Sequence, residues 1–343
     1  GGISYSISSP ANDQLRWERT ASTNVGLDAM FLNNRIEFTF DWYYRNSTDL
    51  LANDQNDPTT GFSSLMKNVG EMSNSGIEIA LGADVIKNDQ FRWHSLYNLS
   101  YNFNNVKKYN LTRLYANSYT GRPQIVEGKP ADALYVYRFA GLNEEGHATY
   151  WNAQGERVLG SQAIDPEDVV YAGTTRPKFD MSFTNWFTYK NFDLSFMFIA
   201  KLGHKYRKDS FSGTNYINRH VTERWREPGD EETTIYPRLQ RYSSDRFYFP
   251  YADIFIGKAN YLKLRDVTLT YRLPEKAVSA IGLANAKLYF QARNLFTVTA
   301  KGVDIDPEVA EVNETGSTMD MTQQGYTSLP HRAEFYLGLS FTF

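Results

Sequence analysis

A short acidic segment near the end of the chain has the residue types of a cation site. Asp304, Asp306 and Glu308 place carboxylates at alternate positions, and hard cations such as calcium are bound by oxygen ligands. The segment lacks the remaining ligand positions of an EF-hand loop. The three carboxylates are therefore a calcium candidate, and no other metal and no cofactor is expected.

The other titratable residues do not form a recognisable catalytic set. The chain has no cysteine, its five histidines are scattered, and it contains no Gly-rich phosphate loop, GxSxG or HExxH motif. Acidic pairs occur at Glu144-Glu145 and Glu231-Glu232, but a glycosidase needs two carboxylates that face each other across about 5–10 Å. Adjacent acidic residues are more typical of a solvated surface, so the sequence does not predict an enzyme.

Three aromatic residues in polar segments are candidates for contact with a ligand. Tyr150, Trp151 and Trp225 have charged residues nearby, and aromatic faces suit sugar rings as well as protein interfaces. The alternative is that these rings pack the polar segments against one another. The residues leave open whether a ligand would be a sugar or a peptide.

The end of the chain shows which kind of element must carry these segments. Over residues 334–343 apolar and polar side chains alternate with a period of two, as in a strand with one apolar and one polar face. The apolar positions are Phe335, Leu337, Leu339, Phe341 and Phe343. A strand of a membrane β-barrel has this pattern, because one face meets lipid and the other a wet lumen.

The same alternation recurs along the chain. Eight further segments carry it: 25–31, 36–44, 77–85, 91–103, 179–187, 192–200, 267–271 and 288–292. Short connections are expected at 32–35, 86–90, 189–191 and 273–285, and long polar ones at 45–74, 104–178, 202–256 and 299–332. Short and long connections alternate strictly, which is typical of outer-membrane barrels with short periplasmic turns and long external loops. A strand-like segment at 135–142 would break this alternation if it crossed the membrane, so it is expected in an external loop.

Composition limits the class of protein. The net charge of −3 gives no basic footprint for nucleic acid, and no apolar run is long enough for a transmembrane helix. The aromatic content of 15%, with 24 Tyr and 22 Phe, is high for such a polar chain and fits aromatic girdles at the membrane interfaces. A soluble carbohydrate-binding or hydrolytic β protein has a similar composition and remains the alternative.

The expected fold is thus all-β, an antiparallel transmembrane barrel portion of about nine strands. Bacterial single-chain barrels have an even number of strands, and an open edge in lipid leaves backbone groups unsatisfied. Residues 1–343 are therefore expected to be the C-terminal part of a larger barrel. The remaining strands would lie upstream or on another chain.

Six sequence segments also resemble those of a known family. They include LRWERT at 15–20 leading into TNVGLD at 23–28, NVGEM at 68–72 with SGIE at 75–78, YRFAGL at 137–142, YAGTTRPK at 171–178, YLKLRDVTL at 261–269 and NLFT at 294–297. In this order they resemble the SusC/RagA family of TonB-dependent outer-membrane transporters. The resemblance covers nearly the whole chain.

The resemblance implies a function and partners. The family has a 22-stranded barrel with an N-terminal plug, a SusD-like surface lipoprotein as a lid, and energy supplied through TonB; the plug and the TonB-contacting segment are not part of this sequence. It implies import of oligosaccharides, or of oligopeptides, across the outer membrane of a Gram-negative bacterium of the Bacteroidetes type. It also implies that Phe343 is an assembly signal. The partners expected are the lipoprotein, TonB, the remaining barrel and plug, and outer-membrane lipid, with no nucleic acid.

Overall fold

The computed structural model describes residues 11–55, 59, 61–62, 64–110, 115–120, 125–160, 164–208, 210, 218–239, 245–280, 282–303, 305–315, 322–327 and 330–343. Asp304 of the calcium candidate lies outside these residues. None of the helices in these ranges is long and apolar enough to cross a membrane.

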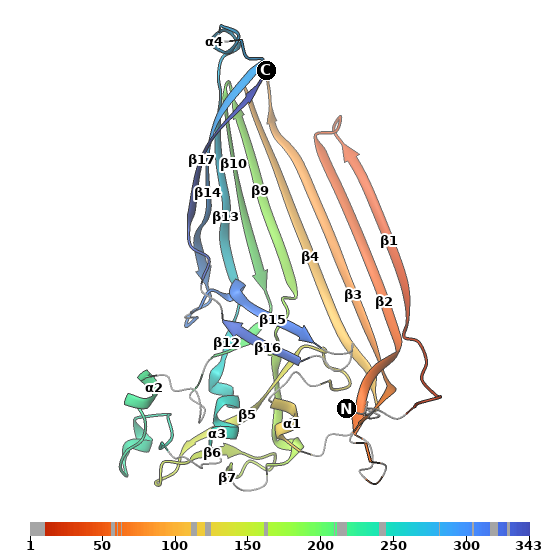
Figure 1. Ribbon diagram of the computed structural model, residues 1–343, viewed down its shortest axis with the longest axis vertical. Helices are drawn as coiled ribbons and strands as arrows, with labels where there is room; N and C mark the ends of the chain where they lie inside the picture. Colours follow the sequence, from red (N-terminus) through yellow and green to blue (C-terminus); the bar gives the residue numbers. More distant parts are fainter. Residues whose placement is uncertain are drawn as a thin grey trace, which may run out of the picture.

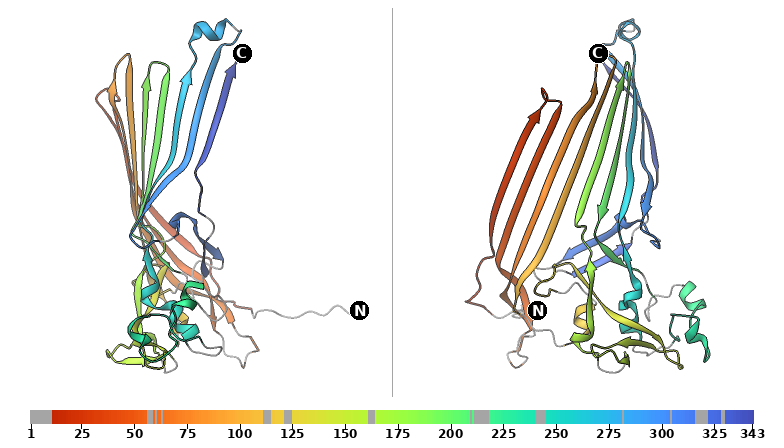
Figure 2. Two further views of the ribbon diagram at one scale, coloured as in Figure 1. Left: turned by 90° about the vertical axis from the view of Figure 1, so that its left-hand side faces the viewer. Right: turned by 180° about the vertical axis from the view of Figure 1, so that it is seen from behind.

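The described residues form one large antiparallel sheet of nine strands that follow one another in chain order (Figure 1). The strands are β1 (Arg19–Phe31), β2 (Ile36–Gln55), β3 (Ser64–Lys87), β4 (Phe91–Tyr109), β9 (Phe179–Tyr189), β10 (Phe192–Leu202), β13 (Tyr261–Arg272), β14 (Asn285–Thr299) and β17 (Glu334–Thr342). All nine segments expected from the period-two pattern are present. The sheet is a curved wall whose two edges are β1 and β17 (Figure 2).

One end of the wall, the turn end, carries the short connections and the last residue of the chain (Figure 1). The tight turn after β1 places Leu32, Asn33 and Asn34 at positive φ, a conformation that asparagine tolerates better than most residues. Lys190 has the same conformation between β9 and β10. The connection between β13 and β14 contains the short helix α4 (Glu275–Ser279). The opposite end is the loop end.

Three strands extend further toward the loop end than the sequence pattern indicates. β2 and β3 stay paired as far as Gln55 opposite Ser64, and β4 continues to Tyr109. The expectation of a polar loop over 45–74 was therefore wrong. The period-two pattern arises because one face of each strand contacts lipid, so the pattern stops at the membrane boundary. The backbone hydrogen bonds between strands do not depend on lipid, so the strands stay paired beyond that boundary.

The long connections fold into small elements at the loop end. Segment 135–142 is β5 (Ala133–Leu142), and it lies outside the large sheet, as expected. It forms a four-stranded sheet with three strands that the sequence did not indicate: β6 (Ala148–Trp151), β7 (Arg157–Leu159) and β8 (Val169–Thr174), in the order β7-β6-β5-β8. Two-stranded sheets join β11 (Lys205–Arg207) to β12 (Ile256–Lys258) and β15 (Ala310–Thr315) to β16 (Thr322–Thr327). The helices there are α1 (Asn117–Thr120), α2 (Asn218–Thr222), α3 (Asp245–Tyr248), η2 (Pro166–Asp168), η3 (Asp230–Glu232), η4 (Phe249–Tyr251), η5 (Asp253–Phe255) and η6 (Pro307–Val309).

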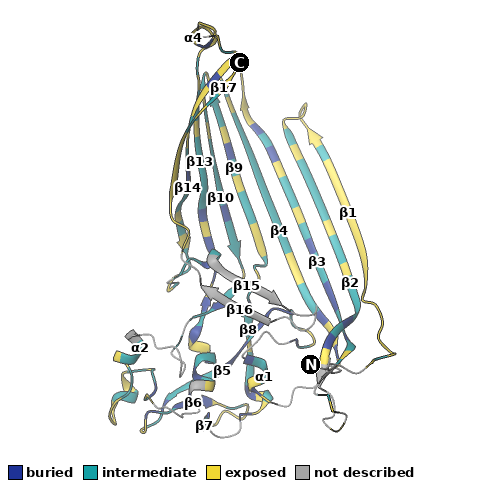
Figure 3. Cartoon of the chain, in the orientation of Figure 1, coloured by how far each residue is buried: buried dark blue, intermediate teal, exposed yellow. Residues whose placement is uncertain are grey.

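The buried apolar clusters lie at the loop end, whereas buried residues on the rest of the wall are scattered along its strands (Figure 3). One cluster, the loop core, joins β5, β6 and the helical segment 245–255; it contains Ala116, Tyr137, Leu142, Ala148, Tyr150, Ile164, Phe249, Ala252 and Phe255. A second cluster lies where β2, β3 and β4 continue beyond the other strands, and it includes Leu50, Val69 and Val106. The loops are thus a folded layer that rests on the loop end of the wall.

The wall itself has one apolar and one polar face. On β10, Phe196 lies on the apolar face, where its ring is 5.9 Å from that of Phe187 on β9. Ser195 pairs with Trp186 on the opposite face. Asn185 is a polar residue on the apolar face, yet its side chain is 1% exposed. Its Oδ1 accepts hydrogen bonds from Trp93 Nε1 at 2.8 Å and Ser95 Oγ at 2.5 Å.

Candidate functional site

Strand register brings three carboxylates into one row on the polar face. Asp41 on β2 lies opposite Glu78 on β3, Glu78 lies opposite Ser100 on β4, and Ser100 lies opposite Asp180 on β9. Neighbouring strands are about 4.8 Å apart, so the row gathers side chains that are distant in sequence. We call these four residues the acidic row.

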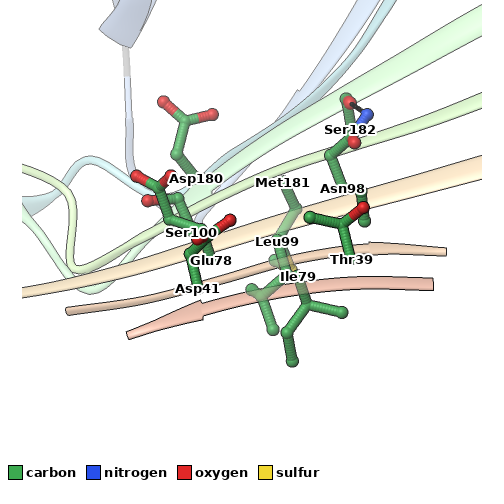
Figure 4. A pocket seen from close by; sticks show the side chains of 11 residues that line it. Thr39, Asp41, Glu78, Ile79, Asn98, Leu99, Ser100, Asp180, Met181 and Ser182 are labelled. Carbon is green, nitrogen blue, oxygen red and sulfur yellow. Dashed lines mark hydrogen bonds between the residues drawn. The ribbon is translucent and has the colours of Figure 1, made fainter. Parts of the chain in front are cut away.

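The acidic row borders an open pocket of about 390 Å³ in the wall (Figure 4). The other lining residues are Thr39, Ile79, Ala80, Asn98, Leu99, Met181 and Ser182. Asn98 Nδ2 donates to Ser182 Oγ at 3.0 Å, and Thr39 Oγ1 donates to Asp28 Oδ1 at 2.8 Å. The pocket therefore offers carboxylates at one end and hydroxyl and amide groups next to them.

The acidic row is only partly neutralised. Lys201 Nζ lies 3.2 Å from Asp180 Oδ2, whereas Asp41 and Glu78 have no ion pair within the part of the chain that the structure describes. Like charges directly opposite each other on neighbouring strands, such as Asp41 and Glu78, are destabilising. The arrangement favours a bound group that donates hydrogen bonds or carries positive charge. Sequence patterns identified these positions as polar but could not show that they share a row.

The calcium candidate has protein cations as neighbours. Lys263 Nζ lies 2.9 Å from Asp306 Oδ2 and also contacts Glu308. Arg265 contacts the other oxygen of Glu308. Within the described ranges no group of three or more acidic or histidine side chains is arranged to hold a metal ion. The described carboxylates of this segment are thus engaged by Lys263 and Arg265.

The three aromatic candidates do not share one surface. Tyr150 is 1% exposed in the loop core, 5.8 Å from the ring of Tyr137, so in this structure it packs loops together. Burial raises the pKa of Tyr150 well above its usual value. Trp151, the next residue, is 42% exposed and remains available for contact with a ligand.

The ring of Trp225 packs against the turn at Gly146 in the loop layer. A Cβ atom added to Gly146 would lie 2.3 Å from the Trp225 ring, and Gly146 has a φ of +77°. Trp225 Nε1 donates to Glu231 Oε2 at 2.9 Å, and this hydrogen bond lowers the pKa of Glu231. Glu231 also accepts from the backbone of Gly229. Glu231 therefore stabilises the conformation of its own loop by accepting these two hydrogen bonds.

The geometry defines a class of protein: a membrane β-barrel wall with a polar, pocketed inner face and a folded external layer. The family model described as "TonB dependent receptor-like, beta-barrel" matches residues 2–295. The chain therefore belongs to the TonB-dependent receptor family and is part of an outer-membrane β-barrel.

Known relatives agree with this assignment. TonB-dependent receptor P3 of Formosa agariphila is 29% identical over 97% of this chain and 35% of its own length. TonB-dependent receptor SusC of Bacteroides thetaiotaomicron is 29% identical over 100% of this chain and 34% of its own length. A solved structure of the RagAB peptide importer in its closed-closed state matches the fold with a TM-score of 0.75 and 24% identity, over 98% of this chain and 37% of that one. The chain thus spans about a third of the length of the curated relatives it matches.

Proposed function

We propose that the full-length protein containing this chain imports an oligomeric nutrient across the outer membrane and that this chain forms one side of the passage. The acidic row carries the proposal, because charged groups on a strand face suit a wet lumen and not lipid. With short turns in the periplasm and long loops outside, the loop layer would surround the external mouth. Membership of the TonB-dependent receptor family supports energy supply through TonB. A plug and further strands would complete the barrel.

Oligosaccharides are the first substrate class we propose. Carboxylate and amide groups bind sugar hydroxyls through hydrogen bonds, and the exposed ring of Trp151 could stack on a sugar. The similarity to SusC supports a SusD-like lipoprotein as the partner that covers the loop end. Co-purification of such a lipoprotein with the tagged full-length protein tests the partnership.

Oligopeptides are the second candidate, and a specific observation favours them. Two carboxylates of the acidic row have no cation partner among the described residues, which suits the amino groups and basic side chains of peptides. The fold match to a peptide importer supports the same alternative. The alternative of a soluble carbohydrate-binding or hydrolytic protein is not pursued, because membership of the TonB-dependent receptor family accounts for the polar, aromatic-rich composition.

Uptake by intact cells tests both substrates. A strain lacking the gene should lose growth on one of a panel of defined polysaccharides or oligopeptides, and so should a strain lacking TonB. Asp41→Asn combined with Glu78→Gln should reduce uptake of a cationic peptide about tenfold and affect a neutral oligosaccharide much less. Glu37→Gln, on the same face of β2 but outside the pocket, is the matched control. Unchanged growth on every substrate would reject the import proposal.

Orientation can be tested independently of the substrate. Tags placed after Asn117 and after Asp230, both in the loop layer, should react with an impermeant reagent on intact cells. A tag at Asn88, in a turn at the opposite end, should not. Labelling at Asn88 alone would reverse the assignment of the two ends.

A further inference from the structure

The cation on the wall that is most deeply buried is Lys263. Its side chain is 0% exposed. Lys263 pairs with Ile199 on β10 and Thr297 on β14, and Ile199 is on the same face of β10 as Ser195. Lys263 therefore belongs to the polar face, where a lysine would otherwise be hydrated by the lumen.

Its partners come from the connection that leaves β14. Asp306 and Glu308 stand 43 and 45 residues beyond Lys263 in sequence. Their side chains are themselves only 8% and 14% exposed. Segment 305–308 must therefore lie directly against the polar face of the wall.

A β-bulge adds a second cation to this contact. The pairing of β13 with β10 shifts between Met197 and Phe198, which makes Arg265 the extra residue of β13; such bulges re-aim side chains. Arg265 reaches Glu308, and its Nη1 donates to Asn294 Oδ1 at 3.2 Å. We call Lys263, Arg265, Asp306 and Glu308 together the clamp.

The start of the connection is attached as well. Ala300 N donates to Asn260 O at 3.1 Å, and Lys208 Nζ donates to Gly302 O at 2.8 Å. Beyond the clamp the chain continues into β15, which pairs with β16 and crosses the loop ends of the barrel strands at a steep angle (Figure 1). The start of the connection is thus held by the Lys208 side chain and the Asn260 backbone, both from the connection between β10 and β13, and segment 305–308 is held by side chains of β13.

We propose that residues 305–315 form a strap that the clamp holds against the lumenal wall and that opens as a unit when the clamp separates. The physical basis is the energetics of buried ion pairs. In the closed state the attraction between the charges is offset by their loss of water, and in the open state each charge is hydrated by the lumen. The ion pairs of the clamp therefore contribute less net free energy than their short distances suggest, and the proposed opening depends on this small net contribution. Opening exposes Lys263 on the inner wall and frees the partly exposed Arg265 from Glu308. A role of these cations beside a substrate path rests on the proposed function, whereas the strap itself does not.

Hydrogen exchange in the purified full-length protein tests the strap without any transport assay. Glu308→Gln weakens the clamp at both cations, Asp306→Asn with Glu308→Gln removes both carboxylates, and Lys263→Met removes the central cation. Each variant that gives a heat-modifiable, folded barrel should exchange the amides of 305–315 at least tenfold faster than the unmodified protein, with β9 and β10 unchanged. Lys287→Met, an exposed lysine on the same face of β14, should leave exchange as it was.

Three results would overturn the proposal. The first is unchanged exchange of 305–315 in a folded clamp variant. The second is faster exchange spread equally over β9, β10 and the strap, which would mean general destabilisation. The third needs no variant: rapid, unprotected exchange of 305–308 in the unmodified protein would show that the clamp does not hold the strap.

Discussion

Two neighbouring residues of β10 allow a sharp test of which face of the wall meets lipid. Phe196 lies on the apolar face between Asn185 and Val267, and Ser195 lies on the polar face. We predict that Phe196→Arg strongly destabilises the folded barrel in lipid, whereas Ser195→Arg changes its stability little. The two substitutions add the same charge at adjacent positions, so each is the control for the other.

The magnitude follows from the depth of Phe196 in the wall. It stands four residues from Phe192, the first residue of β10 at the turn end, which is about 13 Å along a strand at about 3.3 Å per residue. With a strand tilt of about 40° this places it about 10 Å above the periplasmic boundary, near the middle of an apolar band about 25 Å tall. Arginine at that depth costs about 2–4 kcal/mol. Loss of the contacts with Phe187 and Phe198 adds to this cost.

Refolding of the full-length protein into lipid vesicles measures the effect. Denaturant titration followed by heat-modifiable electrophoretic mobility gives the free energy of unfolding of each variant. Phe196→Arg should lower it by about 2–4 kcal/mol, and Ser195→Arg by less than about 0.5 kcal/mol, as for other solvated sites. Equal losses for the two variants would falsify the register, and a larger loss for Ser195→Arg would reverse the faces.

Three further predictions concern the loop layer and the end of the chain. Gly146→Ala should destabilise the loop layer by about 1–3 kcal/mol more than Gly155→Ala, measured by local hydrogen exchange; both positions have positive φ, but only the first meets Trp225, and equal costs would refute the contact. Burial lowers the pKa of His204 to about 4 from the usual 6.5, so between these values the unfolded chain binds a proton that the folded chain does not. The local stability should therefore be complete above about pH 6.5 and fall by about 3 kcal/mol as the pH approaches 4. Exchange of the β11–β12 amides should show this, and His204→Gln should abolish it; a pH dependence that persists in the variant would assign it elsewhere. Deletion of Phe343 in the full-length protein should lower the amount of folded barrel in the outer membrane, with Tyr or Trp restoring it and Leu restoring it poorly; equal rescue by Leu would mean that hydrophobicity alone matters.

The sequence by itself determined the transmembrane architecture. Period-two alternation depends on only two environments, lipid and water, and each strand reports them locally. The nine strands, the strict alternation of short and long connections, and the exclusion of segment 135–142 from the wall could therefore be predicted without tertiary contacts. The same signal is absent outside the membrane, which is why the extensions of β2, β3 and β4 were not predicted.

Tertiary structure decided where side chains from different strands meet. Asp41, Glu78 and Asp180 become one row only through register, and a register depends on backbone pairing over the whole sheet. The Oδ1 of Asn185 on the apolar face is paired only because Trp93 and Ser95 donate to it from the neighbouring strand.

The clamp shows the same limit over a longer range. From sequence, Asp306 and Glu308 were part of a calcium candidate with Asp304 in a polar loop, because nothing near them in the chain indicates a buried lysine. The fold places Lys263 against them across 43 and 45 residues, and a buried cation needs carboxylates at hydrogen-bond distance. Local patterns specify what each residue prefers, whereas the identity of its partner is fixed only when the strands and loops are assembled.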